Sequence, residues 1–171
     1  MKSVLISIQP QWCELIASGK KTVEVRKTRP KLETPFKVYI YETLAEKIKL
    51  SYCVKGTINR GVGKVIGEFV CNKIEEFRPV SNNCCIYYIS ENEILRTGLT
   101  QGELLDYADG KVMYHWHISN LVIYDEPREL SEFRKPIDCH RGKDRENCIG
   151  CWDCEIKRPP QSWCYVEEVG E

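Results

Sequence analysis

Short segments that alternate polar and apolar residues recur along the chain and constrain its fold more than any other feature. Such alternation is typical of strands that place one face on a core. It predicts strands at residues 3–8, 22–26, 36–42, 64–79, 85–90, 113–124 and 162–167. Two other segments predict helices: residues 10–18, which begin at a proline and end before Gly19, and residues 100–107, where Thr100 and Glu103 have capping-box spacing.

This order of elements predicts an α+β fold, a small and mostly antiparallel β-barrel with one to three peripheral helices. A chain of 171 residues is long enough for one domain with its own core, so we expect residues 1–171 to form a single domain. Residues 134–160 are polar, charged and rich in cysteine, and we interpret them as an insertion before the last strand. Residues 43–63 form a long polar connection, of a length that often covers a site.

The charge balance of the chain argues against one class of function. The chain has 25 basic and 25 acidic residues, which argues against nucleic-acid binding through bulk positive charge. The charge is unevenly spread, because residues 1–64 carry a net +8 and residues 65–171 a net −8. Hydrophobic residues make up 42% of the chain without any long apolar run, so we expect a cytoplasmic globular protein that does not bind membranes.

The strongest local pattern runs from Gly19 to Arg26, where a helix ends at a glycine and leads into a strand with alternating charges. On a strand, Glu24 and Arg26 share one face about 6.5 to 7 Å apart. Lys21 lies in the preceding turn, and its stem is long enough to reach them. Two cations would keep the carboxylate ionised and offer donors to a phosphate or a base edge. The alternative, of about equal weight, is a set of ordinary solvated charges.

These residues resemble a known family. Gly19, Lys21, Glu24 and Arg26 fill the pattern G-x-K-x-x-E-x-R of the ASCH domain, a member of the PUA-like superfamily of small β-barrels. Residues 7–12 are similar to the opening strand and helix start of that family. The segment 158–166 is similar to a phage and prophage branch of it.

The resemblance implies a ligand cleft beside the first helix and a role in binding RNA or a modified nucleoside. In that interpretation the ligand-binding residues are Lys21, Glu24, Arg26 and Trp12. RNA, a nucleotide or a modified nucleoside is then the expected partner, and whether a protein partner exists stays unknown.

Two other functions stay open. The first is a hydrolase that acts on RNA or a nucleoside, with Lys21 and Glu24 as catalytic residues. A small bacterial branch of the fold hydrolyses N4-acetylcytidine with a lysine, a threonine and a glutamate. Lys21 matches the lysine, whereas Glu24 stands in place of the threonine, and Glu68 and Glu103 are the candidates for the later glutamate. The second is a phage-derived adaptor whose acidic part binds another protein.

His115 and His117 are two residues apart in a predicted strand, so both face the same side. They fit an acid and base pair or two metal ligands. We favour a simpler interpretation, in which neighbouring backbone groups or carboxylates satisfy both rings.

The cysteine-rich segment predicts a metal site. Cys139, Cys148, Cys151 and Cys154 offer four thiolates from one short stretch, as a structural zinc ion requires. His140 or Cys164 is an alternative fourth ligand. An iron-sulfur cluster fits the same spacing, and free thiols in a loop are the third possibility.

Overall fold

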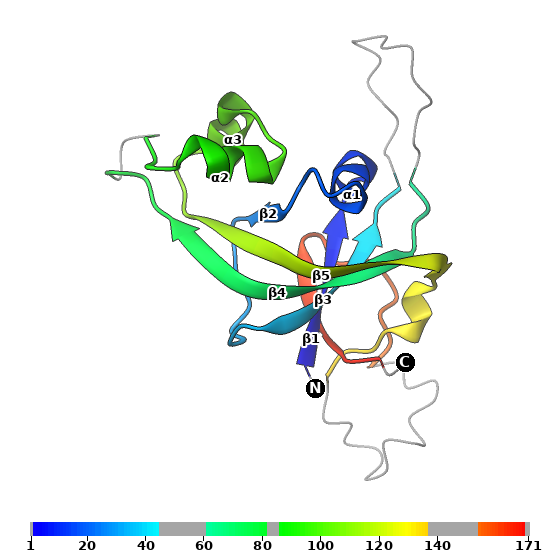
Figure 1. Ribbon diagram of the computed structural model, residues 1–171. Helices are drawn as coiled ribbons and strands as arrows, with labels where there is room; N and C mark the ends of the chain where they lie inside the picture. Colours follow the sequence, from blue (N-terminus) through cyan, green and yellow to red (C-terminus); the bar gives the residue numbers. More distant parts are fainter. Residues whose placement is uncertain (1, 45–60, 82–85, 137–153, 170–171) are drawn as a thin grey trace. The chain divides into compact units, whose positions relative to one another are not determined.

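The computed structural model describes residues 2–44, 61–81, 86–136 and 154–169. Its helices and strands follow one another along the chain as drawn in Figure 1. They are β1 (Lys2–Ile8), α1 (Pro10–Ala17), β2 (Val23–Arg26), β3 (Phe36–Glu42), β4 (Val65–Phe77), α2 (Glu91–Thr97), α3 (Gln101–Ala108), β5 (Met113–Arg128), the short 3-10 helix η1 (Leu130–Glu132) and β6 (Trp163–Glu167).

Both predicted helices and all but one of the predicted strands are present in the described residues. The capping box at α3 is confirmed, because the Thr100 side chain accepts a hydrogen bond from the Glu103 backbone and the Glu103 side chain accepts one from the Thr100 backbone. The predicted strand at 85–90 is wrong for residues 86–90, which form no strand. Their burial does alternate, with Tyr87 and Ile89 packed on a core cluster and Ile86 and Tyr88 exposed.

Helix α2 follows that segment and was not predicted. It begins after Ser90, whose side chain accepts a hydrogen bond from the Glu93 backbone, and ends at Gly98 in a left-handed conformation. Alternation alone therefore missed a seven-residue helix whose signals are its two caps.

The six strands form one mixed sheet in the order β2-β5-β4-β3-β1-β6. Strands β1 and β3 are parallel, whereas β1 pairs with β6, and β2 with β5, in antiparallel fashion. The sheet is therefore mixed, and the expected closed barrel is wrong. Closure requires the first and last strands of the order to pair, and in the described residues β2 and β6 are edge strands. The parallel pair arises because the chain crosses over through α1 and β2 between β1 and β3.

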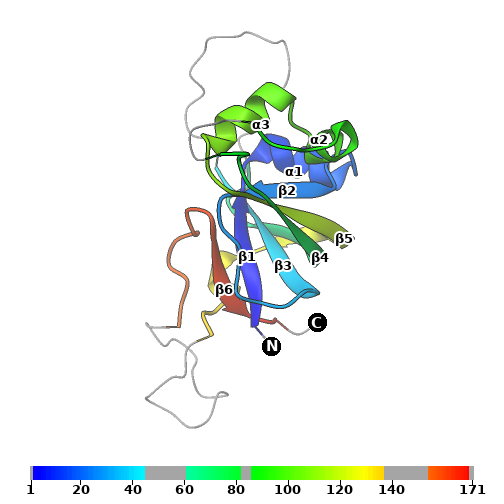
Figure 2. The ribbon, with the colours of Figure 1, turned by 90° about the vertical axis from the view of Figure 1, so that its left-hand side faces the viewer.

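The chain divides into two compact units, and β4 and β5 each contribute to both. Unit 1 comprises Met1–Pro10, Lys37–Glu68 and Ile123–Glu171. In it β1, β3 and β6 lie side by side, as Figure 2 shows. Its core contains Leu5, Tyr39 and Phe133, with the Tyr39 and Phe133 rings packed edge to face at 4.9 Å between centroids.

Unit 2 comprises Gln11–Phe36 and Phe69–Val122. It contains α2, α3, β2 and most of α1. Its core cluster joins Val25 on β2 to Leu104 and Ala108 on α3 and to Met113 at the start of β5. The residues from Gly19 to Arg26 all belong to this unit.

Among the helices that the structure describes, none combines the length and the apolar character that crossing a lipid bilayer requires.

Candidate functional site

The turn between α1 and β2 places the charged motif. Gly19 adopts φ +72°, which ends the helix in a left-handed conformation that glycine adopts without a steric cost. The Lys21 backbone then donates to the Leu15 carbonyl at 2.9 Å, and the Thr22 backbone donates to the Arg96 carbonyl at 2.9 Å. The start of β2 is therefore held by both α1 and α2.

The structure brings Lys21, Glu24 and Arg26 together. Lys21 Nζ lies 3.2 Å from Glu24 Oε2, and Arg26 Nη2 lies 2.9 Å from Glu24 Oε1. Lys21 Nζ also donates to the Thr97 carbonyl at the end of α2, at 2.6 Å. The alternative of solvated charges is wrong, because the Lys21, Glu24 and Arg26 side chains are only 3%, 8% and 11% exposed.

Trp12 on α1 joins this group. Lys21 Nζ lies 5.6 Å from the centroid of its ring, within the range of a cation–π contact, and Trp12 is partly exposed. We call Trp12, Lys21, Glu24 and Arg26 the motif cluster. Its four side chains are those that the sequence predicted as ligand-binding, and they come from one helix, one turn and one strand.

The electrostatics of the motif cluster keep Glu24 ionised. Burial on its own would raise the pKa of Glu24, but attraction and hydrogen bonds from Lys21 and Arg26 outweigh that effect and hold the pKa below its usual value. With one anion and two cations, the cluster carries a net charge of +1.

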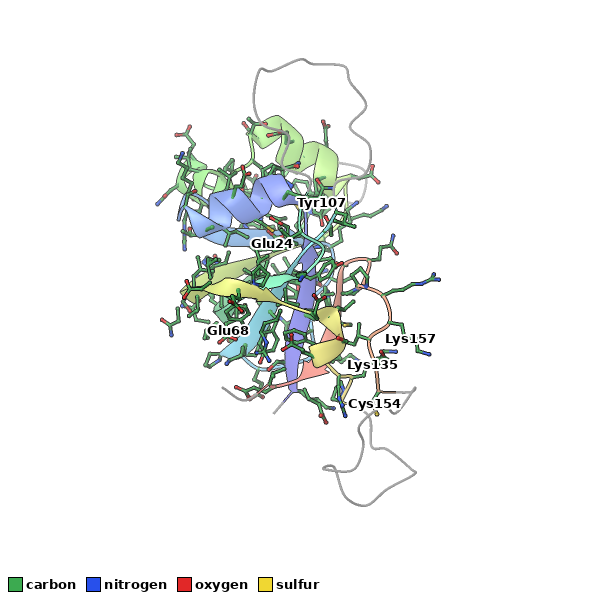
Figure 3. All side chains as sticks on the ribbon, turned by 90° about the vertical axis from the view of Figure 1, so that its right-hand side faces the viewer. Glu24, Glu68, Tyr107, Lys135, Cys154 and Lys157 are labelled. Carbon is green, nitrogen blue, oxygen red and sulfur yellow. The ribbon has the colours of Figure 1, made fainter. Side chains whose placement is uncertain are left out.

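Tyr107 on α3 lies beside the motif cluster, and the sequence did not predict it. The charges of Arg26 and Glu24 both act on its hydroxyl, and Figure 3 labels Tyr107 and Glu24. Burial raises the pKa of Tyr107, while the charge of Arg26 lowers it and that of Glu24 raises it. Lys27, the residue after β2, lies 5.3 Å from the centroid of the Tyr107 ring, and Tyr107 is 38% exposed. An exposed aromatic ring with cations beside it therefore borders the buried charges.

The two histidines lie on the other face of the same pair of strands. Residues directly opposite in an antiparallel pair share a face. The pairs are Val23 with His117, Glu24 with Trp116, Val25 with His115 and Arg26 with Tyr114. Each histidine contacts a carboxylate: His115 Nδ1 lies 2.9 Å from Glu93 Oε1, and His117 Nε2 lies 2.6 Å from Glu75 Oε2. These contacts agree with the interpretation favoured from the sequence, in which neighbouring carboxylates pair with both histidine rings.

The two candidates for a later catalytic glutamate have other roles. Glu103 caps α3 and is exposed. Glu68 belongs to unit 1, where it accepts a hydrogen bond from the Tyr124 hydroxyl at 2.6 Å and pairs with Lys37 at 2.9 Å.

The predicted zinc ligands are mostly beyond what the structure covers. Cys139, Cys148 and Cys151, and the alternative ligand His140, lie outside the described residues. Cys154 is buried, and its carbonyl accepts a hydrogen bond from the Lys135 backbone at 2.9 Å. Figure 3 labels both residues. The four-cysteine site stays a prediction.

The fold agrees with comparisons to known proteins. The family model of the ASCH domain matches residues 6–124, and the chain therefore belongs to the ASCH domain family. ASCH domains have a PUA-like fold that is generally associated with RNA binding. The match includes the whole motif cluster and both histidines, and it ends before the cysteine-rich segment.

Two crystal structures of ASCH from Zymomonas mobilis resemble the chain in fold. The first is 20% identical, with a TM-score of 0.53, and the match covers 97% of this chain and 88% of that one. The second, a mutant form of that protein, is 18% identical, with a TM-score of 0.59 and coverage of 97% and 89%. A comparison with curated protein sequences gives no match.

Proposed function

We propose that this protein binds single-stranded RNA, or a modified nucleoside within it, at the surface formed by the motif cluster, Lys27 and Tyr107. The observation that carries the proposal is that two partly exposed aromatic side chains lie beside a buried group with net positive charge. Trp12 contacts Lys21, and Tyr107 lies beside Lys27 within reach of the charges of Arg26 and Glu24. Family membership supports RNA as the ligand class.

The burial of the charged side chains of the motif cluster supports a functional role for them. Removing three charges from water is costly, and a well-packed apolar cluster would stabilise the fold as well. A functional reason for keeping the charges is that Glu24 holds Arg26 in one orientation beside Tyr107. An oriented guanidinium recognises phosphate or a base edge with less loss of side-chain entropy than a mobile one.

The aromatic residues favour a single strand over a duplex. Bases stack on aromatic side chains only when they are unpaired and splayed out. The zero net charge of the chain also disfavours the sequence-independent backbone binding that duplex-binding proteins use. Stacking beside a few fixed cations therefore supports single-stranded RNA best.

We favour binding over hydrolysis because of the state of Glu24. Both of its oxygens contact cations, and its lowered pKa leaves it a weak proton acceptor near neutral pH. Lys21 is likewise held by Glu24 and by the Thr97 carbonyl. The two residues predicted as catalytic therefore serve better as a fixed support than as a proton-transferring pair.

The proposal is tested by titrating a fluorescently labelled single-stranded RNA oligomer with wild-type protein and with Tyr107→Leu. Loss of one stacking ring is worth about 1 to 3 kcal/mol, so we expect the variant to bind about 5- to 150-fold more weakly. Tyr88→Leu is the matched control, because Tyr88 is 85% exposed and is not part of the proposed surface. We expect the RNA recovered after titration to be intact.

Equal affinities of Tyr107→Leu and Tyr88→Leu would contradict the proposed surface. Shortened RNA after incubation with the wild-type protein, but not with a Lys21→Met variant, would favour the hydrolase instead.

A further inference from the structure

Three side chains from three elements of unit 2 converge at a point that the proposed RNA surface does not use. Glu75 lies near the end of β4, Glu93 on α2 and His117 on β5, and one ligand atom from each falls within 4.8 Å of the other two. His117 Nε2 is 2.6 Å from Glu75 Oε2 and 3.7 Å from Glu93 Oε1. One imidazole nitrogen therefore faces two carboxylates.

Hydrogen bonding accounts for only part of this arrangement. An imidazole nitrogen donates one hydrogen bond, and the short contact to Glu75 uses it. The second carboxylate, Glu93, has its hydrogen bond with His115 instead, so its 3.7 Å approach to His117 Nε2 is not itself a hydrogen bond. The cations that contact these carboxylates, Lys73 on Glu75 and Arg96 on Glu93, are 59% and 40% exposed and so neutralise them from the solvent side.

His115 provides a second layer around the cluster. It is fully buried, and its Nδ1 holds Glu93 Oε1 at 2.9 Å. Its Nε2 has no hydrogen-bond partner in the described part of the chain. A metal-binding carboxylate is commonly fixed by such a neighbour, which orients the ligand and raises its affinity. Glu93 is thus oriented by a residue that reaches no solvent.

The spacing suits a small metal ion. Bond lengths of about 2.0 to 2.2 Å to nitrogen and oxygen separate ligands in a tetrahedral site by about 3.4 Å. His117 Nε2 lies 2.6 Å from Glu75 Oε2 and 3.7 Å from Glu93 Oε1, one distance below that value and one above it. Small shifts of the side chains would therefore bring all three atoms to bonding distance from one ion. The imidazole favours a transition metal over Mg²⁺ or Ca²⁺, and three protein ligands leave at least one position for water.

We infer that Glu75, Glu93 and His117 bind a divalent first-row transition-metal ion, with His115 as the residue that positions Glu93. The site lies on the strand face opposite the motif cluster, because Val23 and Val25 of β2 pair with His117 and His115. None of its four residues belongs to the cysteine-rich segment of the sequence, residues 134–160. The inference therefore does not depend on RNA binding.

The probe is Mn²⁺, which prefers oxygen and nitrogen ligands and so largely avoids the ten cysteines of the chain. Its free concentration is followed by electron paramagnetic resonance during titration of the full-length protein. We expect one bound Mn²⁺ per chain, and binding at least about tenfold weaker in Glu75→Gln and in His117→Gln.

Glu76→Gln is the matched control, because Glu76 is the neighbour of Glu75 on β4 and pairs with Arg78. It should bind Mn²⁺ as the wild type does, and so should Tyr107→Leu. Glu75 is only partly buried, so Glu75→Gln keeps the test valid if His117→Gln fails to fold.

Three results would overturn the inference: no Mn²⁺ bound by the wild type, equal weakening by Glu75→Gln and Glu76→Gln, or loss of the bound ion when Cys139, Cys148 and Cys151 are changed to serine. The last result would assign the ion to the cysteine-rich segment.

Discussion

Glu24 contacts a different cation through each of its carboxylate oxygens, so its ionisation is linked to the stability of unit 2. The pKa of Glu24 is lowered in the folded protein, which means that the unfolded chain binds a proton more readily. Its contribution to stability is therefore complete above the unfolded pKa of 4.5 and is lost as the pH falls through the lower folded value.

A Glu24→Gln variant removes this pH dependence. At pH 7 we expect it to be less stable by about 2 kcal/mol or more, because two buried cations lose their anion. Between about pH 5 and pH 3 the wild type should lose stability more steeply than the variant, measured by urea unfolding at each pH. Glu14→Gln, at an exposed position of α1, is the control and should follow the wild type. Parallel curves for the wild type and Glu24→Gln would contradict the buried ion pairs.

Residue spacing predicted the motif cluster only in part. The alternation from Thr22 to Arg26 and the reach of Lys21 were sufficient to bring Lys21, Glu24 and Arg26 together. The Thr97 carbonyl and the Tyr107 ring were not predicted, because they reach the motif from helices more than seventy residues further along the chain. Likewise, the period of two placed His115 and His117 on one face but gave no signal for Glu75 and Glu93.

At the scale of elements, Gly61, which precedes β4, packs closely against the backbone of Thr43, the residue that follows β3. Gly61 has φ +69°, and a Cβ there would lie 2.0 Å from the Thr43 carbonyl oxygen and 2.8 Å from Pro10 Cγ. A backbone oxygen cannot move aside cheaply, so a side chain at this position forces the connection away from β3 and α1.

We expect Gly61→Ala to lower the free energy of unfolding by about 2 kcal/mol or more, seen as a fall of about 4 to 8 °C in Tm. Gly102→Ala is the contrasting variant, because that position lies in α3 with open space around it. It should be neutral or more stable by up to about 1 kcal/mol. A Gly61→Ala protein as stable as the wild type would contradict the close approach at Thr43.

Strands were easier to predict than their connections. The long strands β1, β3, β4 and β5 carry strong alternation or branched apolar residues, and these were found close to their predicted bounds. Residues 86–90 alternate as well, yet packing of Tyr87 and Ile89 on the core cluster does not require a hydrogen-bonded neighbour. Alternation reports burial on one face, and pairing is a separate condition that depends on the rest of the fold.

At the scale of the whole molecule, the zero net charge is the sum of two oppositely charged parts of the sequence, residues 1–64 and residues 65–171. The motif cluster and Lys27 lie in the part of the sequence with net charge +8. Tyr107 and the proposed metal ligands Glu75, Glu93 and His117 lie in the part with net charge −8. Each candidate site therefore has its own local charge, net positive on one face of β2 and β5 and rich in carboxylates on the other. This supports two ligands of opposite charge, an RNA and a metal cation.

The sequence patterns did not predict the topology of the sheet. Strand order and the parallel pairing of β1 with β3 depend on which segments meet in space, and residue patterns do not encode that directly. The family resemblance supplied the fold class, and it was correct about the ASCH domain, although the sheet described is open and mixed.

The measurement that tests RNA binding at the motif cluster most directly is a ¹H–¹⁵N NMR titration of the labelled protein with a single-stranded RNA oligomer. We expect the shift changes to be concentrated at the Trp12 indole, at the amides of residues 20–27 and around Tyr107, while amides of β1, β3 and β6 in unit 1 stay unchanged. Shift changes confined to unit 1, or none at saturating RNA, would contradict the proposed function.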